Sequence, residues 1–203
     1  MESQARGGTR WKRFAVVMVP SVAATAAIGV ALSQGALAAS FSVSGQQFKL
    51  TAGKINATGF TQYGALDSTK AGKKPVTVVG MDKAEISDLC QSVVIPVPVF
   101  GDVSMNLTAG KDAPVEAKKL FVDADELSAN ATFNNIDIGV SVDDTTKGPG
   151  PHKGDTYLPG SFAQQAESAT LTDVKQRAWA TTAGTFKLSG LHMSVKKGKH
   201  ECY

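Results

Sequence analysis

The sequence has no motif that would identify a common hydrolase, a nucleotide-binding enzyme or a zinc protein. No serine has glycines two residues before and two residues after it, which excludes the nucleophile elbow of the common esterases and lipases. No glycine-rich loop links a strand to a helix as a phosphate-binding loop does. Two cysteines and three histidines supply no set with zinc-ligand spacing. We therefore identify no catalytic, cofactor-binding or metal-binding residue and expect no cofactor.

The first 39 residues predict a secretory signal peptide or a single membrane anchor. Residues 14–32 carry no charge, and small residues at 36 and 38 follow at the spacing of a cleavage site. The basic residues that precede the apolar run are Arg6, Arg10, Lys12 and Arg13. The run is longer than most signal peptides and almost long enough to span a bilayer, so both interpretations stay open. In either case residues 40–203 are expected outside the cytoplasm, free or anchored to the outer face of the cytoplasmic membrane.

The exported part has no excess of either charge. The whole chain has 21 basic and 18 acidic residues, but residues 40–203 have 17 of each. A protein that binds nucleic acid normally carries a clustered positive face. We therefore expect no nucleic-acid partner.

Cys90 and Cys202 are the only cysteines, and both lie in the exported part. An even number of cysteines in an oxidising compartment favours a disulfide, although two free thiols that never meet are the simpler alternative. A bridge would close a loop of 111 intervening residues. In the chain-entropy model such a loop stabilises the fold by about 4–5 kcal/mol.

Short alternating stretches after residue 40 predict an all-β domain. Apolar residues at every second position, as in 103–107 and 136–142, are typical of half-buried strands. Twenty glycines and eight prolines interrupt the pattern, and Thr145–Ser161 has the composition of a long surface loop. The length of the exported part suits one domain.

The chain also resembles itself at several places. The pattern Ala-x-Ile-x-Asp-Leu at 84–89 recurs as Ala-x-Leu-x-Asp-Val at 169–174, and LTAGK occurs at both 50–54 and 107–111. Spaced apolar residues extend the match into three copies. The copies comprise Ala84, Leu89, Val94, Phe100, Met105 and Leu107; Ala117, Val122, Leu127, Phe133, Ile138 and Val140; and Ala169, Val174, Trp179, Phe186, Leu191 and Met193.

These repeats predict strand units that share one core. Phe100, Phe133 and Phe186 should then be equivalent and buried, because each copy inserts its large side chain at the same place. The spacing between copies is too irregular for a regular solenoid. We expect a sandwich-like or irregular β-helical body built from repeated strand units.

Histidines and clustered acids are the remaining candidates for chemistry. His152, His192 and His200 are the only histidines, so a serine-dependent hydrolase would have to use one of them as its base. The acidic groups at 123–126 and 143–155 lack the spacing of a calcium-binding loop. Solvated acidic turns explain them more simply.

Three stretches resemble an exported actinobacterial family of unknown function. They are the opening MESQARGGTRWKRFAVVMVP, the central ISDLCQSVVIPVP and the ending VKKGKHECY. The resemblance covers nearly the whole chain and implies export, paired cysteines and an unassigned role. Members of such families sometimes carry the label cholesterol esterase, and they often accompany a small multi-pass membrane protein.

Three functions are consistent with the sequence. The first is a non-enzymatic structural or interaction domain of the cell envelope, with envelope components or a small multi-pass membrane protein as partners. The second is a module that binds a lipid or another apolar ligand between its strands. The third is a hydrolase of lipid or sterol esters.

Overall fold

Strands provide nearly all the regular structure in the computed structural model, which describes residues 45–69 and 72–203. The elements are β1 (Phe48–Thr69), β2 (Gly72–Ser87), β3 (Leu89–Val97), β4 (Gly101–Ala109), β5 (Val115–Ser141), the 3-10 turn η1 (Val142–Asp144), β6 (Phe162–Thr182), β7 (Thr185–Lys187) and β8 (His192–Lys197). The all-β prediction is confirmed. The predicted signal or anchor at 1–39 lies outside the described residues.

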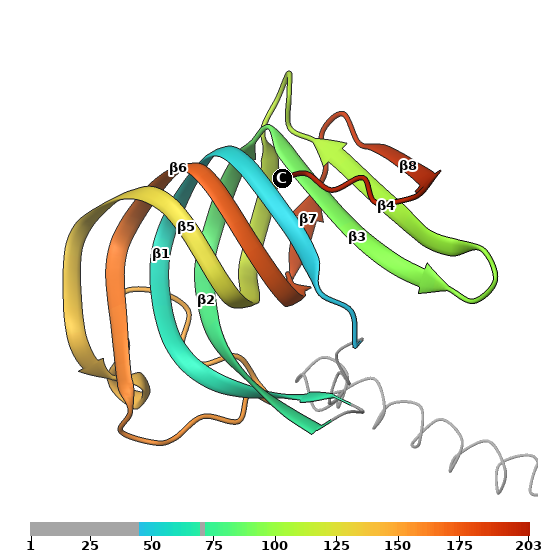
Figure 1. Cartoon of the computed structure of the whole chain (residues 1–203). Helices are drawn as coiled ribbons and strands as arrows, with labels where there is room; N and C mark the ends of the chain where they lie inside the picture. Colours follow the sequence, from blue (N-terminus) through green and yellow to red (C-terminus); the bar gives the residue numbers. More distant parts are fainter. Residues whose placement is uncertain (1–44, 70–71) are drawn as a thin grey trace, which may run out of the picture. The chain divides into compact units, whose positions relative to one another are not determined.

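Four long strands close on themselves. β2 pairs with both β1 and β5, and β6 pairs with both β5 and β1, all antiparallel. Side-chain hydrogen bonds from Thr170 to Asn56 and from Gln164 to Gln62 continue the β1–β6 register beyond the paired backbone. Figure 1 shows these strands curving side by side. The ring β1–β2–β5–β6 is therefore the body of the domain.

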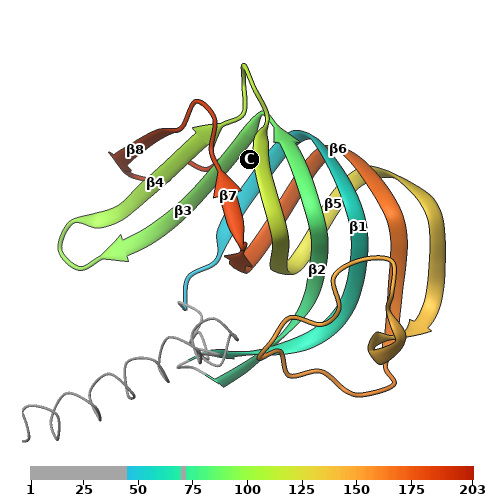
Figure 2. The same ribbon diagram turned by 180° about the vertical axis from the view of Figure 1, so that it is seen from behind.

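β2 and β3 run along β1 as one interrupted strand. Ser87 lies opposite Lys54 and Cys90 lies opposite Thr51, so the register is kept across the break. Asp88 between them has a φ of 53°, and aspartate tolerates this left-handed region better than most residues. Past Val93, β3 has no further partner on β1 and continues with β4 and β8 as a three-stranded sheet. We call this sheet of β3, β4 and β8 the arm, and Figure 2 shows it extending beyond the ring.

The ring holds the main hydrophobic core. Most of its buried residues come from β1, β2, β5 and β6, with Leu89 of β3 and Ala109 of β4 at its end, and alanine is the most frequent of them. A closed sheet of only four strands has a narrow interior, which small side chains fill without strain. A second buried cluster, centred on Tyr63, Val78 and Phe121, lies where the segment 142–161 returns to β1 and β2.

This closed arrangement differs from the sandwich-like or β-helical body expected from the repeats. In a sandwich two sheets pack face to face, whereas here each long strand pairs edge to edge with the next until the ring closes. The pairing of β6 with β1 joins segments more than 120 residues apart in the chain. Alternation in the sequence carries no information on such a pairing.

The predicted equivalence of three phenylalanines is wrong. Phe100 is 69% exposed in a turn and Phe186 is 38% exposed in β7. Phe133 alone packs on the core, with its ring 5.0 Å from that of Phe60. The second half of each repeat copy therefore meets a different environment, so the copies do not insert into one common core.

The shorter repeated motifs do have a structural meaning. Asp88 and Asp173 both take a left-handed φ, of 53° and 54°, and each precedes a buried apolar residue. The two LTAGK segments lie on opposite edges of β3, where Thr51 and Thr108 both pair with Cys90. The repeated LTAGK segment thus corresponds to two strands, β1 and β4, that pair with opposite edges of β3 at the same residue.

Candidate interaction surface

One face of the arm is apolar along all three strands. Pairing places Val93 beside Met105 and Met105 beside Val195, and alternate residues of a strand share a face. The arm face comprises Val93, Ile95, Val97, Val103, Met105, Leu107, Met193 and Val195. No strand or loop among the described residues pairs with the outer edge of β8.

This arm face is open to solvent at its outer strand. Met193 is 60% and Val195 is 66% exposed, and together with Met105 they line a shallow groove of about 210 Å³. Single exposed apolar residues are common on proteins, but a contiguous apolar patch marks an interaction surface or an aggregation hazard. Edge strands that carry such a patch are usually protected. The arm face therefore has the chemistry of a docking surface.

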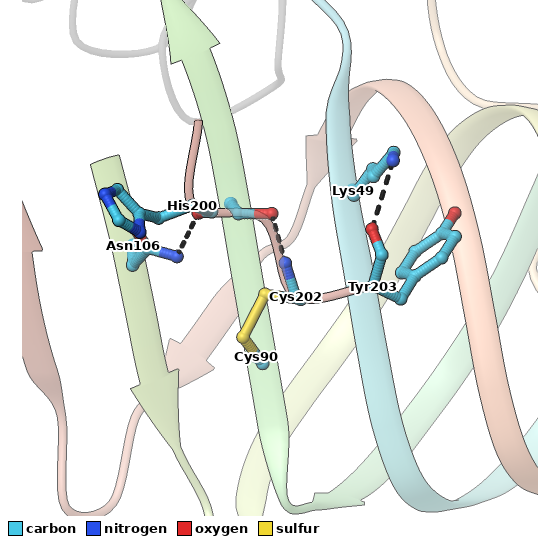
Figure 3. Close-up of a disulfide and its surroundings, with 7 residues drawn as sticks. Lys49, Cys90, Asn106, His200, Cys202 and Tyr203 are labelled. Atoms are coloured by element: carbon cyan, nitrogen blue, oxygen red, sulfur yellow. Dashed lines mark hydrogen bonds between the residues drawn. A yellow bond between two sulfur atoms is a disulfide. The ribbon is translucent and has the colours of Figure 1, made fainter. Parts of the chain in front are cut away.

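The opposite face of the arm is covered by the C-terminal tail, residues 198–203, as Figure 3 shows. His200 N–H donates to Ser104 Oγ at 2.8 Å, and Asn106 donates to the His200 carbonyl at 2.8 Å. Cys202 N–H donates to Ser92 Oγ at 3.0 Å. The tail ends over β1, where Lys49 Nζ donates to the Tyr203 carbonyl at 3.1 Å. The tail thus covers this polar face and makes hydrogen bonds to three of its side chains, whereas no such segment among the described residues covers the exposed outer strand of the apolar face.

A disulfide fixes this tail to the arm. The structure joins Cys90 of β3 to Cys202, with Cα atoms 6.0 Å apart. Cys90 pairs with Thr51 of β1 on one side and with Thr108 of β4 on the other. The pair proposed from the sequence thus lies at the root of the arm and ties the end of the chain to its central strand.

The loop 145–161, predicted as a surface loop, is partly buried against the ring. Thr61 Oγ1 donates to the Pro149 carbonyl at 2.8 Å, and Leu66 N–H donates to the Thr156 carbonyl at 2.8 Å. Gly148 lies so close to Phe60 that an added Cβ would come within 2.7–2.8 Å of its backbone. The glycines and prolines of this loop therefore allow close packing on β1.

A cluster of carboxyl groups and a tyrosine lies beneath this loop. Tyr63 donates to Asp155 Oδ2 at 2.5 Å and accepts from the His152 backbone N–H at 2.9 Å. Burial and the hydrogen bond to Asp155 hold the pKa of Tyr63 above its usual range. Burial, together with the nearby charges of Asp67 and Asp155, raises the pKa of Asp123 to about 7. These contacts hold the loop on the ring and make that attachment sensitive to pH.

An apolar cleft of about 620 Å³ opens beside the same loop. Its walls include Leu66, Tyr157, Leu158 and Phe162, of which Leu158 and Phe162 are largely exposed. Ligand pockets commonly have volumes of about 300–1,000 Å³ and predominantly apolar walls. The cleft is therefore a second candidate site, suited to an apolar ligand.

The histidines are not arranged as a hydrolase would need. The His152 ring lies 4.7 Å from that of Phe121, and its Nδ1 is 3.4 Å from Asp155. His192 begins the exposed strand β8, and the His200 ring contacts the Lys197 carbonyl. Among the hydrogen bonds of residues 45–69 and 72–203, none joins a serine hydroxyl to a histidine ring nitrogen. The part of the chain that the structure describes therefore shows no serine paired with a histidine base.

The acidic residues that adjoin one another in the sequence are separated in space. Register shifts on both sides of Ala124 place Asp123 in the buried cluster, whereas Asp125 and Glu126 form ion pairs with Arg177 at 2.9 and 3.2 Å. Asp143 accepts from Gly160 N–H and Tyr157. Within the described part of the chain, no three potential ligands converge as a metal ion requires.

The arm face was not recognised in the sequence, although one signal was present. Alternation at 103–107 indicated a strand with one buried face, but it could not show that nothing covers that face. Pro96 and Pro98 are the missed signal. Proline within a strand is confined to free edges, and Pro96 lies in the part of β3 that has moved beyond β1, with Pro98 in the turn that follows.

A family model described as a family of unknown function, DUF6230, matches residues 44–203. A search of curated proteins found no match, and neither did a search of solved structures. In the two described stretches no helix has the length and apolar character to cross a membrane.

Proposed function

The chain belongs to DUF6230, a family of unknown function, and we propose that it is an exported, non-enzymatic interaction protein of the cell envelope. The observation that carries this proposal is the arm face, an unpartnered apolar surface on a sheet whose other face is sealed by the chain's own tail. A fold that covers one face with a disulfide-bonded tail and leaves the apolar face open favours contact with something outside the chain.

Export is supported by the basic, apolar and small-residue order of residues 1–39 and by the cysteine pair. The domain would then act outside the cytoplasm, either released or held at the outer face of the cytoplasmic membrane. Its partners would be envelope components or the small multi-pass membrane protein that the family resemblance suggests. Mass determination of the N-terminal residue, on protein recovered from native envelopes, distinguishes a cleaved signal from a retained anchor.

Site-specific photo-crosslinking in cells tests the arm. A photoreactive residue is placed at Met193 on the arm face, with a matched position at Ile138 on β5, which is equally exposed. The proposal expects crosslinks to envelope material from position 193 and few from position 138. Equal yields at both positions, or no crosslinks at either, would contradict it.

A second function, binding of an apolar ligand, is favoured by the cleft beside the loop 145–161. Leu158 and Phe162 expose apolar side chains along its wall, although neither is needed for the core. A fluorescent fatty acid should bind the protein, and Leu158→Arg should abolish binding without loss of stability. Retained binding in that variant would exclude this cleft. Ester hydrolysis remains the third candidate, with no assembled nucleophile to favour it.

A further inference from the structure

The arm tip, Pro98 to Phe100, exposes its apolar residues to solvent. The β3–β4 turn begins and ends at the pair Val97 and Gly101. Val99 is 103% and Phe100 is 69% exposed, so neither side chain contributes to packing within the domain. Figures 1 and 2 both show this turn at the far end of the arm.

The backbone of the tip is also strained. Val99 has a φ of 72°, a region that glycine or asparagine adopts readily and a β-branched residue does not. Strain of this kind is concentrated at functional sites, since the fold would be more stable without it. A valine that is both strained and fully exposed is therefore explained by a contact beyond the chain.

Two lysines of β8 lie near the tip, one on each face of the arm. Lys197 pairs with Val103 and Lys196 with Ser104, a few residues from the turn. The nearby Asp102 forms an ion pair with Lys199, at an N–O distance of 3.7 Å. Among the ion pairs of the described residues none involves Lys196 or Lys197, so both charges are available to a ligand of opposite sign.

We propose that the arm tip inserts into the surface of an anionic phospholipid bilayer, with Val99 and Phe100 below the headgroups and Lys196 and Lys197 at the phosphates. This inference rests on the proposed function, because it names the contact that the arm makes. Apolar side chains gain free energy on leaving water, and lysines near an anionic leaflet add electrostatic attraction.

Two further features favour lipid over a protein partner. Pro96 and Pro98 have no backbone N–H, so the tip takes fewer unpaired donors into an apolar phase. A stable protein interface also needs about 800 Å² from each partner, far more than a turn of three residues presents. A reversible membrane contact needs only a few inserted side chains.

Tryptophan fluorescence in the full chain tests the insertion. F100W places the probe at the tip, and I138W places it at a similarly exposed residue of β5. Both variants keep Trp11 and Trp179, so background emission and any membrane contact of residues 1–39 are the same in both. Vesicles contain phosphatidylglycerol and phosphatidylcholine, with or without bromine on the acyl chains.

The proposal expects the emission of F100W to move to shorter wavelengths and to be quenched by brominated chains, whereas the emission of I138W stays unchanged. Adding K196Q and K197Q should move the lipid titration midpoint by roughly fivefold per lysine. Vesicles of phosphatidylcholine alone should be bound more weakly. Equal responses of F100W and I138W would overturn the insertion.

A second measurement separates this inference from the proposed function. The double variant V99D/F100D is tested for binding to washed native envelopes, with circular dichroism as the check on folding. Unquenched F100W together with envelope binding that V99D/F100D abolishes would refute lipid insertion and leave the arm as the contact for another envelope partner. Unquenched F100W with unchanged envelope binding of V99D/F100D would refute any contact through the tip, whereas the arm face is tested separately by crosslinking at position 193. Quenching of F100W, with weaker envelope binding of V99D/F100D, supports both the insertion and the proposed function.

Discussion

Replacing Asp123 by asparagine should stabilise the protein at high pH. The pKa of this carboxyl rises from 3.8 to about 7, first because of burial and then because of the nearby charges of Asp67 and Asp155. Between these two pH values the folded state keeps a proton that the unfolded state has released. The free energy of unfolding therefore falls as the pH rises from about 4 to about 7. Asparagine, like the protonated carboxyl, carries no charge and abolishes this fall.

The size of the expected change in unfolding free energy follows from the pKa shift of Asp123. The full shift corresponds to about 4 kcal/mol, which we reduce to roughly 2–4 kcal/mol because the side chain is partly exposed to solvent. Between pH 5 and pH 8 the advantage of D123N over the wild type should grow by roughly 2 kcal/mol. Urea denaturation followed by circular dichroism measures this difference.

A matched control lies two residues along the same strand. Asp125 forms an ion pair with Arg177 at 2.9 Å on the solvent side, and D125N should change the free energy of unfolding by less than about 1 kcal/mol, with no such pH dependence. A constant difference between D123N and the wild type from pH 5 to pH 8 would refute the burial of this carboxyl and the cluster built around it.

Three further predictions concern stability. Cys202→Ser should lower the free energy of unfolding by about 4–5 kcal/mol and make the tail accessible to protease, whereas alkylation of the wild type without reductant should label neither cysteine. Phe133→Ala should cost about 2–4 kcal/mol, because its ring packs on Phe60, while Phe100→Ala should cost less than about 0.5 kcal/mol; similar losses at both sites would contradict the assigned burial. Gly148→Ala should cost about 1–3 kcal/mol, because its Cβ would meet the Phe60 backbone, and Gly150→Ala, which has open space, should cost much less. Urea denaturation measures each change.

The strands could be predicted from the sequence because alternation is a local property. Residues 103–107 and 136–142 alternate as half-buried strands do; the first segment lies in β4, and the second lies in β5 as far as Ser141. The long loop was visible in its glycines and prolines for the same reason. The even number of cysteines and the expected export likewise predicted a disulfide between Cys90 and Cys202.

The closure of the ring and the openness of the arm could not be predicted in this way. Alternation shows that Met105 and Met193 lie on an apolar face, but only the three-dimensional pairing shows whether another element covers that face. Phe100 misled the repeat argument because its spacing matches that of Phe133, whereas the turn that carries it faces solvent. The buried cluster around Asp123 is also invisible in the sequence, since its members are brought together by the return of the loop to β1.

The C-terminal tail has a mechanical consequence for the arm. β1 begins at Phe48 opposite Val93, so a force that pulled the arm away from the start of β1 would open the β1–β3 ladder one hydrogen bond at a time. The tail lies across that line of opening, with a covalent bond to β3 at Cys90 and an ion pair to Lys49 on β1 at 3.2 Å. The tail therefore links β1 and β3 independently of their backbone hydrogen bonds and would carry part of a force that pulls these two strands apart. Reducing the disulfide would remove the covalent bond between the tail and β3, so the arm could then rotate more freely about the end of the β1–β3 ladder.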